Sequence, residues 1–298
     1  MTKLAVCGMG LLGRPIATRL LEAGHEVTVW NRTPERADPV VQRGAARAET
    51  PADAARGVEV AITVLSTPQA LEQVVLASDG LAEGLPEGSL LVEMSTVGPD
   101  AVRDLAGRLP SGIELVDAPV LGSVREATEG ALKVFAGGSD EAYERLLPLF
   151  EVLGFPRHVG PLGSGAAMKL VVNSTLGPVM AAIGEALALG RALGLDRRAV
   201  LDVLEGAVVG PTVRSKRGRI ESGVYEPNFR LETALKDSNL LTRAAEARGV
   251  RLRQAETVRD LLAEADGAGL SRMDYSALIA HIAALPASLP EPPNEAGP

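Results

Sequence analysis

Lys169 and Asn173 stand four positions apart in GSGAAMKLVVNST, residues 163–175, a stretch of mostly small and apolar side chains. Residues with this spacing share one face of a helix, so an ammonium and an amide would lie together there. A lysine in such a helix either extends its amine to water or has a buried task. One such task is to stabilise the negative charge that develops on a carbonyl oxygen under hydride attack, and to supply the proton. Asn173 would orient the reactant by hydrogen bonds without adding charge.

A glycine motif near the N-terminus indicates which partner could deliver a hydride. The strand-like segment 3–8 runs into GMGLLG, where Gly8, Gly10 and Gly13 form G-x-G-x-x-G ahead of a helical stretch. The first glycine permits a tight turn, the second lets a pyrophosphate approach the backbone, and the third permits close packing of helix and strand. The phosphate would rest on the helix N-terminus. This context predicts dinucleotide binding in preference to an ordinary turn. The predicted contacts are Gly8, Met9, Gly10, Leu11, Leu12 and Gly13.

The residues after the second predicted strand, HEVTVW, bear on the choice between the two nicotinamide cofactors. An NAD site would usually place Asp or Glu here to accept from the ribose 2′-hydroxyl. This chain has Asn31, Arg32 and Thr33 instead. No carboxylate repels a 2′-phosphate, and the arginine offers a forked donor for one. We therefore predict that the cofactor is NADP, with NAD possible. The alternative is that Arg32 is only a solvated arginine in a surface loop.

The first half of the chain alternates strand-like and helical segments. Several of the strand-like segments are apolar on both faces, which is typical of a parallel sheet buried between helices. Strand, helix and strand in repetition predict a doubly wound Rossmann domain of the α/β class, spanning residues 1–162. The predicted strands are 3–8, 25–30, 58–65, 89–94, 113–119 and 131–138.

The second half reads as helices only, from 163 to about 284, with glycines at several predicted helix ends. We predict an all-α domain for substrate binding and oligomerisation over 163–285, joined to the first domain by a long interdomain helix. Because that helix follows the nucleotide domain, we expect it to line the interdomain crevice, which favours a buried task for Lys169. The proline-rich end, 286–298, is predicted to be a disordered tail.

Composition narrows the class of protein. The net charge is −8, with one tryptophan, three tyrosines and four phenylalanines, which argues against a nucleic-acid surface. Cys7 is the single cysteine and the three histidines are scattered, so we predict no metal site. The N-terminus lacks a signal-peptide pattern, and no uninterrupted apolar run reaches the roughly 18 residues of a membrane span. We expect a cytoplasmic protein that binds no membrane.

Five separated stretches of the chain are GMGLLG, EMSTVGP (93–99), DAPVLGS (117–123), GAAMKLVVN (165–173) and ALKDSNL (234–240). Their order and spacing, spread over nearly the whole chain, resemble one family, the β-hydroxyacid dehydrogenases, which include 3-hydroxyisobutyrate dehydrogenase, tartronate semialdehyde reductase and the glyoxylate/succinic semialdehyde reductases. The resemblance implies an NADP-dependent oxidoreductase that interconverts a small hydroxy acid and its semialdehyde or keto acid, acting as a homodimer or homotetramer.

The same resemblance implies roles at matching positions. Lys169 matches the catalytic lysine. Cofactor contacts are implied for Leu65, Ser66, Thr96 and Lys236, and substrate contacts for Ser95, Leu121, Gly122, Ser123 and Asn173. The segment holding Gly122 and Ser123 would take the substrate carboxylate. Lys236 could be a second cation that favours neutral lysine in the oxidative direction.

The family commonly reads DAPVSGG where this chain reads DAPVLGS. Leu121 replaces a hydroxyl and Ser123 replaces a glycine, so a bulkier or less polar substrate end is plausible, and the physiological substrate stays open. An imine reductase shares the architecture but usually has another residue at the position of Lys169. The alternative of another class is a non-catalytic NADP-binding module. The basic cluster Arg214, Lys216, Arg217 and Arg219 is interpreted as a solvated helix face rather than an anion site.

Overall fold

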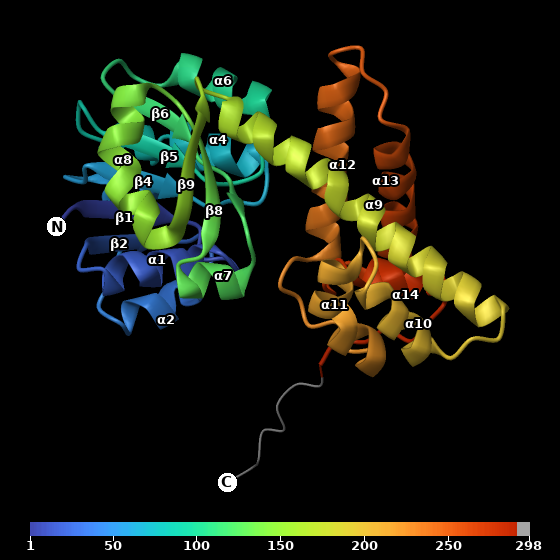
Figure 1. Cartoon of the computed structure of the whole chain (residues 1–298). Helices are drawn as coiled ribbons and strands as arrows, with labels where there is room; N and C mark the ends of the chain where they lie inside the picture. The colour runs from blue at the N-terminus through green and yellow to red at the C-terminus, as the bar shows by residue number, and fades with distance from the viewer. Residues whose placement is uncertain (291–298) are drawn as a thin grey trace, which may run out of the picture. The chain divides into compact units, whose positions relative to one another are not determined.

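The computed structural model describes residues 1–290 and divides the chain into two compact units, Met1–Val171 and Val172–Pro298. The division falls within one long helix, α9 (Ser164–Ala192), which contributes residues to both units (Figure 1). The sequence places the domain boundary after residue 162, where this helix begins.

Unit 1 is built on a nine-stranded sheet in the order β3-β2-β1-β4-β5-β6-β8-β7, with β9 paired to β8. The strands from β3 to β6 are parallel, whereas β8 runs antiparallel to β6 and β7. The six predicted strands are present, and the sequence missed β3, β7 and β9. The bounds are β1 Lys3–Cys7, β2 Glu26–Trp30, β3 Ala46–Arg47, β4 Val60–Thr63, β5 Leu90–Glu93, β6 Glu114–Asp117, β7 Val120–Leu121, β8 Leu132–Gly137 and β9 Gly154–Gly160.

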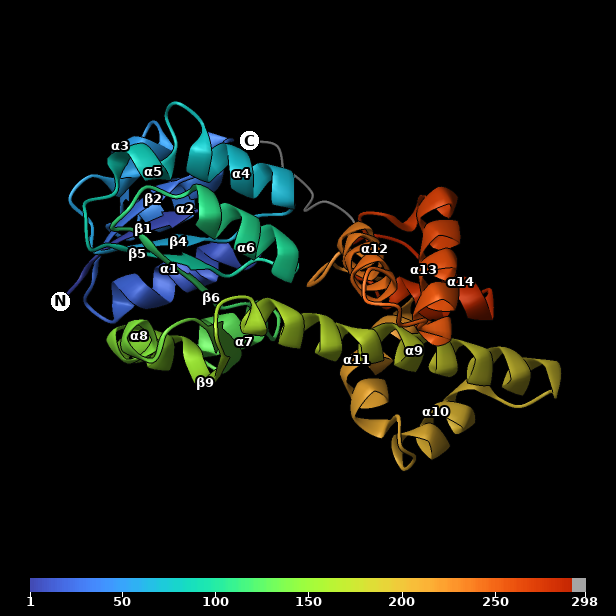
Figure 2. The same cartoon turned by 90° about the horizontal axis from the view of Figure 1, so that it is seen from above.

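Helices cover both faces of this sheet (Figure 2). Alternate residues of a strand point to opposite faces. In β1, Leu4 and Val6 pack with one buried cluster and Ala5 and Cys7 with another. The first cluster includes residues of α1, α2, α7 and α8, and the second includes residues of α3 to α6. The bounds are α1 Gly13–Glu22, α2 Asp38–Val41, α3 Pro51–Ala55, α4 Pro68–Leu76, α5 Leu81–Gly84, α6 Pro99–Arg108, α7 Val124–Glu129 and α8 Asp140–Leu153.

Unit 2 consists of the second part of α9 and further helices, with isolated bridges as the only strand-like pairing among its described residues. Its core gathers apolar side chains from α9 to α14. The fully buried Tyr225 anchors the turn before α12. The bounds are α10 Arg197–Glu205, α11 Gly210–Ser222, α12 Leu231–Glu246, α13 Arg253–Ala265 and α14 Ala277–Ala283.

Among the described residues, α9 is the one helix long and apolar enough to cross a membrane by length and composition. Because α9 carries Lys169, Asn173 and Glu185, it is not an uninterrupted apolar run, and the prediction that no such run reaches about 18 residues is not contradicted. The signal is weak, because core helices of soluble proteins have the same length and composition.

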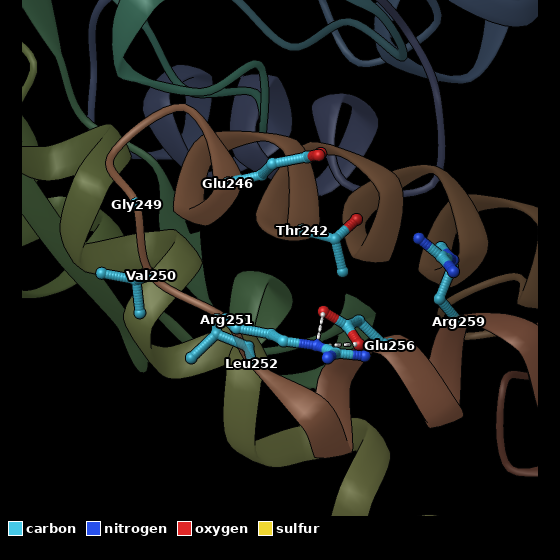
Figure 3. A pocket seen from close by; sticks show the side chains of 8 residues that line it. All are labelled: Thr242, Glu246, Gly249, Val250, Arg251, Leu252, Glu256 and Arg259. Atoms are coloured by element: carbon cyan, nitrogen blue, oxygen red, sulfur yellow. Dashed lines mark hydrogen bonds and ion pairs between the residues drawn. The ribbon is translucent and has the colours of Figure 1, made fainter.

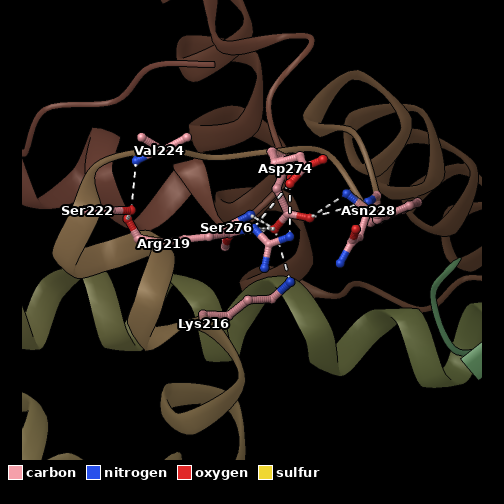
Figure 4. A network of polar contacts seen from close by, with 9 residues as sticks. Lys216, Arg219, Ser222, Val224, Asn228, Asp274 and Ser276 are labelled. Atoms are coloured by element: carbon pink, nitrogen blue, oxygen red, sulfur yellow. Dashed lines mark hydrogen bonds and ion pairs between the residues drawn. The ribbon is translucent and has the colours of Figure 1, made fainter. Parts of the chain in front are cut away.

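A buried carboxylate organises the turn before α12 (Figure 4). Asp274 is 0% exposed, and its Oδ1 accepts hydrogen bonds from Lys216 Nζ at 3.0 Å and Ser276 Oγ at 2.6 Å. Its Oδ2 accepts from the backbone N–H groups of Asn228 and Phe229 at 3.2 and 3.3 Å. Burial alone would raise the pKa of Asp274, but the nearby lysine and these bonds outweigh it and the pKa is lowered. The network thus fixes residues 228–229 against α11.

The other members of the basic cluster are also bonded within unit 2. Arg217 pairs with Asp202, Glu205 and Glu221 at 2.6 to 2.9 Å, which ties α10 to α11. Arg214 donates to the Glu205 carbonyl at 2.7 Å, and Arg219 donates to the Glu226 carbonyl. The interpretation as a solvated face is wrong for Lys216, Arg217 and Arg219, which are half-buried and hold the helices together, whereas Arg214 is exposed.

The predicted disordered tail does not begin at 286. Ser288 donates to the Gly223 carbonyl at 2.8 Å, and its own carbonyl accepts from the Tyr225 N–H at 2.8 Å. The chain is therefore held at this point. The remainder of the predicted tail, 291–298, lies outside the described residues.

Candidate functional site

The glycine turn after β1 has the space that a pyrophosphate needs. A Cβ on Gly13 would lie 1.7 Å from the Gly8 carbonyl oxygen, and one on Gly8 would lie 2.2 Å from the Val64 carbonyl oxygen. Both positions therefore require glycine for close packing. A Cβ on Gly10 would meet nothing within 4 Å, so open space lies over this residue. The turn leads into the N-terminus of α1, where the helix dipole favours an anion. These features fit a dinucleotide pyrophosphate.

The loop after β2 is tied to this turn by Asn31. Its Oδ1 accepts from the Met9 N–H at 2.8 Å, and its Nδ2 donates to the Thr33 carbonyl at 2.8 Å. Both the carbonyl and the NH₂ group of the Asn31 side chain are thus hydrogen-bonded to the backbone, which the sequence did not predict. Arg32 and Thr33 are exposed beside it. Asn31 therefore shapes the loop, while Arg32 and Thr33 are the side chains able to meet a ligand.

The loops after β4 and β5 are joined by a buried polar chain. Glu93 is 1% exposed and accepts from the Thr63 hydroxyl and, at 2.6 Å, from the Ser95 N–H. Ser95 Oγ in turn accepts from the Leu65 N–H at 2.7 Å. Ser95 is 5% exposed, so it supports the loop of Leu65, and its predicted contact with substrate stays a prediction. Ser66 is exposed and Thr96 half-buried in the same loops.

Lys169 belongs to the first turns of α9, and Asp117 at the end of β6 fixes where that helix starts. Asp117 is 1% exposed and accepts from the N–H groups of Gly163 at 2.7 Å and Ala166 at 2.6 Å. A Cβ on Gly165 would lie 2.2 Å from the Phe135 carbonyl oxygen, so the helix packs closely on the sheet. Lys169 is half-buried one turn further along, on a helix end anchored within unit 1.

Burial raises the pKa of Asp117 to about 6, although its two backbone hydrogen bonds oppose the rise. A carboxyl group with a raised pKa keeps its proton in the folded state at a pH where the unfolded chain has lost it. Stability therefore falls as pH increases from about 4 through 6. For Asp117→Asn, which cannot ionise, this fall should be absent. A rise from 3.8 to about 6 corresponds to at most about 3 kcal/mol.

Urea unfolding of both forms at pH 4.5 and 7.5 measures this effect. From pH 4.5 to pH 7.5, the free energy of unfolding of the unmodified chain should fall relative to that of the Asn variant. An equal pH dependence in the two proteins would contradict the prediction.

The predicted carboxylate-binding residues already hold a carboxylate of the chain. Ser123 donates to Glu126 Oε2 from its N–H at 2.8 Å and from its Oγ at 2.6 Å, forming a capping box at the start of α7. Arg125 binds the other oxygen of Glu126. Burial opposes ionisation of Glu126, but these hydrogen bonds outweigh it and lower its pKa to about 2. Leu121 is half-buried and Gly122 exposed beside them.

In unit 2, Asn173 and Lys236 meet at a residue that sequence reasoning missed. Asp237 is 4% exposed; its Oδ2 accepts from Asn173 Nδ2 at 3.0 Å, and its Oδ1 lies 2.7 Å from Lys236 Nζ. Lys236 is thus paired with a carboxylate, and its suggested role as a second cation beside Lys169 stays a prediction. Asp237 follows Lys236 directly in ALKDSNL, so the motif itself carried the signal.

A cavity of about 360 Å³ lies between α12 and α13 and is lined by residues between 242 and 259 (Figure 3). Arg251 on its wall pairs with Glu256 at 3.2 Å, and Arg259 pairs with Asp260 at 2.8 Å. It contains none of the predicted site residues. Over residues 1–290 there is also no group of three or more His, Cys, Asp or Glu that could hold a metal ion.

Comparisons with known proteins find relatives that cover both units. Residues 3–160 match the family model described as the NAD binding domain of 6-phosphogluconate dehydrogenase. Residues 163–282 match the model described as NAD-binding of NADP-dependent 3-hydroxyisobutyrate dehydrogenase. Glyoxylate/succinic semialdehyde reductase 1 of Arabidopsis thaliana is 34% identical over 275 residues, which are 91% of this chain and 95% of that protein.

Two solved structures share the fold over almost the whole chain. The 3-hydroxyisobutyrate dehydrogenase of Mycobacterium tuberculosis, solved with L-serine, is 27% identical with a TM-score of 0.81, covering 94% of this chain and 98% of that one. Psf3 in complex with NADP+ and 2-OPP is 25% identical with a TM-score of 0.84, covering 93% and 99%. With the glycine turn of unit 1 and the lysine helix that follows it, these matches identify the chain as a member of the β-hydroxyacid dehydrogenase family and an NAD(P)-dependent oxidoreductase of the hydroxy acid and semialdehyde type.

Proposed function

We propose that this protein uses NADPH to reduce a small aldehyde or keto acid to its hydroxy acid, and catalyses the reverse reaction with NADP+. The observation that carries the proposal is Lys169, which is held on a helix end anchored to the nucleotide-binding unit by Asp117. When bound, the nicotinamide supplies or accepts the hydride. Lys169 stabilises the developing alkoxide and donates the proton, and in the oxidative direction the neutral amine accepts it.

The preference for NADP rests on the loop after β2. Arg32 is exposed beside a backbone that Asn31 holds in place, and no carboxylate stands among residues 31–33. A guanidinium forms charge-assisted hydrogen bonds with a phosphate, which a 2′-hydroxyl cannot match. Leu65, Ser66, Thr96 and Lys236 complete the proposed cofactor contacts.

The substrate is proposed to be a small carboxylate bound through Gly122 and Ser123, with Leu121 beside its less polar part. Glu126 now accepts from both Ser123 donors, so a substrate carboxylate would compete with it. This competition predicts weak binding of the simplest acids. The identity of the acid is left to assay.

One assay tests the function. NADPH oxidation is measured with glyoxylate, succinic semialdehyde, tartronate semialdehyde and methylmalonate semialdehyde, and repeated with NADH and with a panel of cyclic imines. Turnover of an aldehyde with NADPH supports the proposal. Turnover of imines alone would indicate an imine reductase. NADPH binding without any turnover would indicate a non-catalytic module.

A homodimer or homotetramer is proposed from the apolar surface of unit 2. Leu189 on α9 and Leu193 just after this helix are 61% and 67% exposed, and Val203 on α10 is 75% exposed. Burial of such side chains against a second copy is favourable, at about 25 cal/mol per Å² of apolar surface. Sedimentation should therefore show an oligomer for the unmodified chain and a monomer for the double variant Leu189→Glu, Leu193→Glu. A monomer in both cases would contradict the proposal.

The cellular setting is proposed to be the cytoplasm, with no membrane or nucleic acid as partner. The acidic net charge of −8 and the small number of aromatic residues support this proposal. Fractionation of cells that express the chain would test it, since recovery in the membrane pellet would contradict it.

A further inference from the structure

Asp237 decides which end of the Asn173 amide is available to a ligand. An ionised carboxylate only accepts hydrogen bonds, and an amide has a donating NH₂ and an accepting carbonyl. The contact of 3.0 Å between Asn173 and Asp237 must therefore use the NH₂ of Asn173. Lys236 on the other oxygen of Asp237, at 2.7 Å, favours the ionised form of this carboxylate. The Asn173 carbonyl oxygen is consequently the end turned away from Asp237.

This carbonyl oxygen is buried and accepts no hydrogen bond from any described residue. Buried polar atoms in native proteins are satisfied by protein, water or ligand, so such an atom calls for a partner. The missing partner must be a hydrogen-bond donor. A carboxylate would instead face an acceptor oxygen, with the negative charge of Asp237 nearby.

Asn173 and Asp237 line a cavity of about 30 Å³ within unit 2. A buried water needs roughly 10–15 Å³ by the same kind of measure, so there is room for one or two groups of that size. Most of the remaining wall is apolar, and Phe229 and Tyr275 close it with rings packed edge to face at 5.3 Å. The Asp274 network fixes the backbone of Phe229, whose N–H donates to Asp274 Oδ2 at 3.3 Å. A small donor group therefore suits the site better than a large charged one.

We propose that Asp237 is a positioning residue that presents Asn173 as a hydrogen-bond acceptor, so that the enzyme selects carbonyl substrates carrying a hydroxyl or ammonium donor. This inference rests on the proposed function, in which Asn173 contacts substrate. According to this inference, the substrate carboxylate binds at another part of the site, and the hydroxyl or ammonium group of the substrate donates to the Asn173 carbonyl oxygen.

The first experiment tests the orientation without turnover. In ¹⁵N-edited NMR spectra the side-chain NH₂ of Asn173, assigned by its loss in Asn173→Leu, should be shifted downfield and exchange slowly with water. Asp237→Asn should move it toward the values of an exposed amide, because two amides can pair in either orientation. Glu246→Gln is the matched control, since Glu246 is an exposed carboxylate on the same helix. An unchanged Asn173 signal in Asp237→Asn would overturn the orientation.

The second experiment tests selectivity with two acids that differ by one hydroxyl, 2-hydroxy-3-oxopropanoate and 3-oxopropanoate. The unmodified enzyme should favour the hydroxylated aldehyde at least about tenfold in kcat/KM, since a site built for a donor rejects the analogue that lacks it. Asp237→Asn and Asn173→Leu should each reduce this ratio about tenfold, and Glu246→Gln should not. If Asp237→Asn fails to fold, the ratio of kcat/KM values in Asn173→Leu alone tests the inference.

Equal rates for the two aldehydes in the unmodified enzyme would overturn the inference and leave the proposed function intact. That result would also follow if the Lys169 ammonium, one turn earlier on α9, were the donor to Asn173. If no aldehyde is reduced at all, the proposed function fails. The inference is then judged by calorimetric binding of glycerate and 3-hydroxypropanoate to the NADP+ complex. Tighter binding of glycerate that is lost in Asn173→Leu supports it, and equal or absent binding of both overturns it.

Discussion

Replacing Lys169 by alanine should lower kcat by about three orders of magnitude, while the dissociation constant of NADPH stays the same. Positioned acid–base groups contribute roughly 10²- to 10⁴-fold to a rate, and the lost ammonium would also cease to stabilise the alkoxide. The cofactor turn lies elsewhere in unit 1 and uses backbone rather than Lys169, so NADPH binding should survive. Steady-state assays with the best aldehyde and titration of NADPH fluorescence measure the two quantities.

The matched control is Lys133→Ala, which removes an exposed lysine from β8 of the same unit. Its kcat should equal that of the unmodified enzyme. Lys169→Arg keeps the charge but holds its proton far more tightly, so it should still fail as a base in the oxidative direction. Turnover by Lys169→Ala within a few-fold of the unmodified enzyme would show that the proton comes from another group.

Replacing Arg32 by alanine should raise the KM for NADPH about 10- to 100-fold and change the KM for NADH little. A hydrogen bond to a charged group contributes about 1.5–3 kcal/mol, and only NADPH carries the 2′-phosphate that would receive it. Because Asn31 holds the loop through its bonds to Met9 and Thr33, the backbone should keep its shape in the variant. Initial rates at varied NADPH and NADH give both constants.

Arg56→Ala is the control for general electrostatics. Arg56 is 74% exposed in the same unit and pairs only with Asp53 among the described ion pairs. It should leave the KM for NADPH unchanged. A parallel rise in the KM values for NADPH and NADH in Arg32→Ala would mean that Arg32 contacts a part common to both cofactors, and the proposed basis of NADP preference would be wrong.

The sequence alone identified the fold class and the nucleotide turn because both depend on local chemistry. Runs of Val, Ile and Leu bounded by turn residues located the central strands, and G-x-G-x-x-G between strand and helix indicated the dinucleotide. The short β3 and the half-exposed β9 lack that apolar signal, and β7 is apolar but only two residues long. The pairing of these strands is set by their neighbours rather than by their own side chains. The sequence did not predict that β8 pairs antiparallel to β6 and β7, because this pairing is also set by the neighbouring strands.

The partners of each polar side chain were decided only by tertiary structure. Asn31, Ser95 and Ser123 are predicted ligand contacts from the sequence, and only the fold shows that they also bond to Met9, Leu65 and Glu126. The basic residues of α11 read as a solvated face, yet they bind carboxylates and carbonyls of unit 2.

Asp117 and Asp237 show the same limit at the reactive helix. Nothing in the local sequence of Asp117 reveals that it anchors the start of α9, which is 46 to 49 residues away along the chain. Nor does the position of Asp237 reveal that it orients Asn173, 64 residues away. Residue type and spacing determine which chemistry a chain can perform. Which donor meets which acceptor depends on contacts between distant segments, and these exist only once the chain has folded.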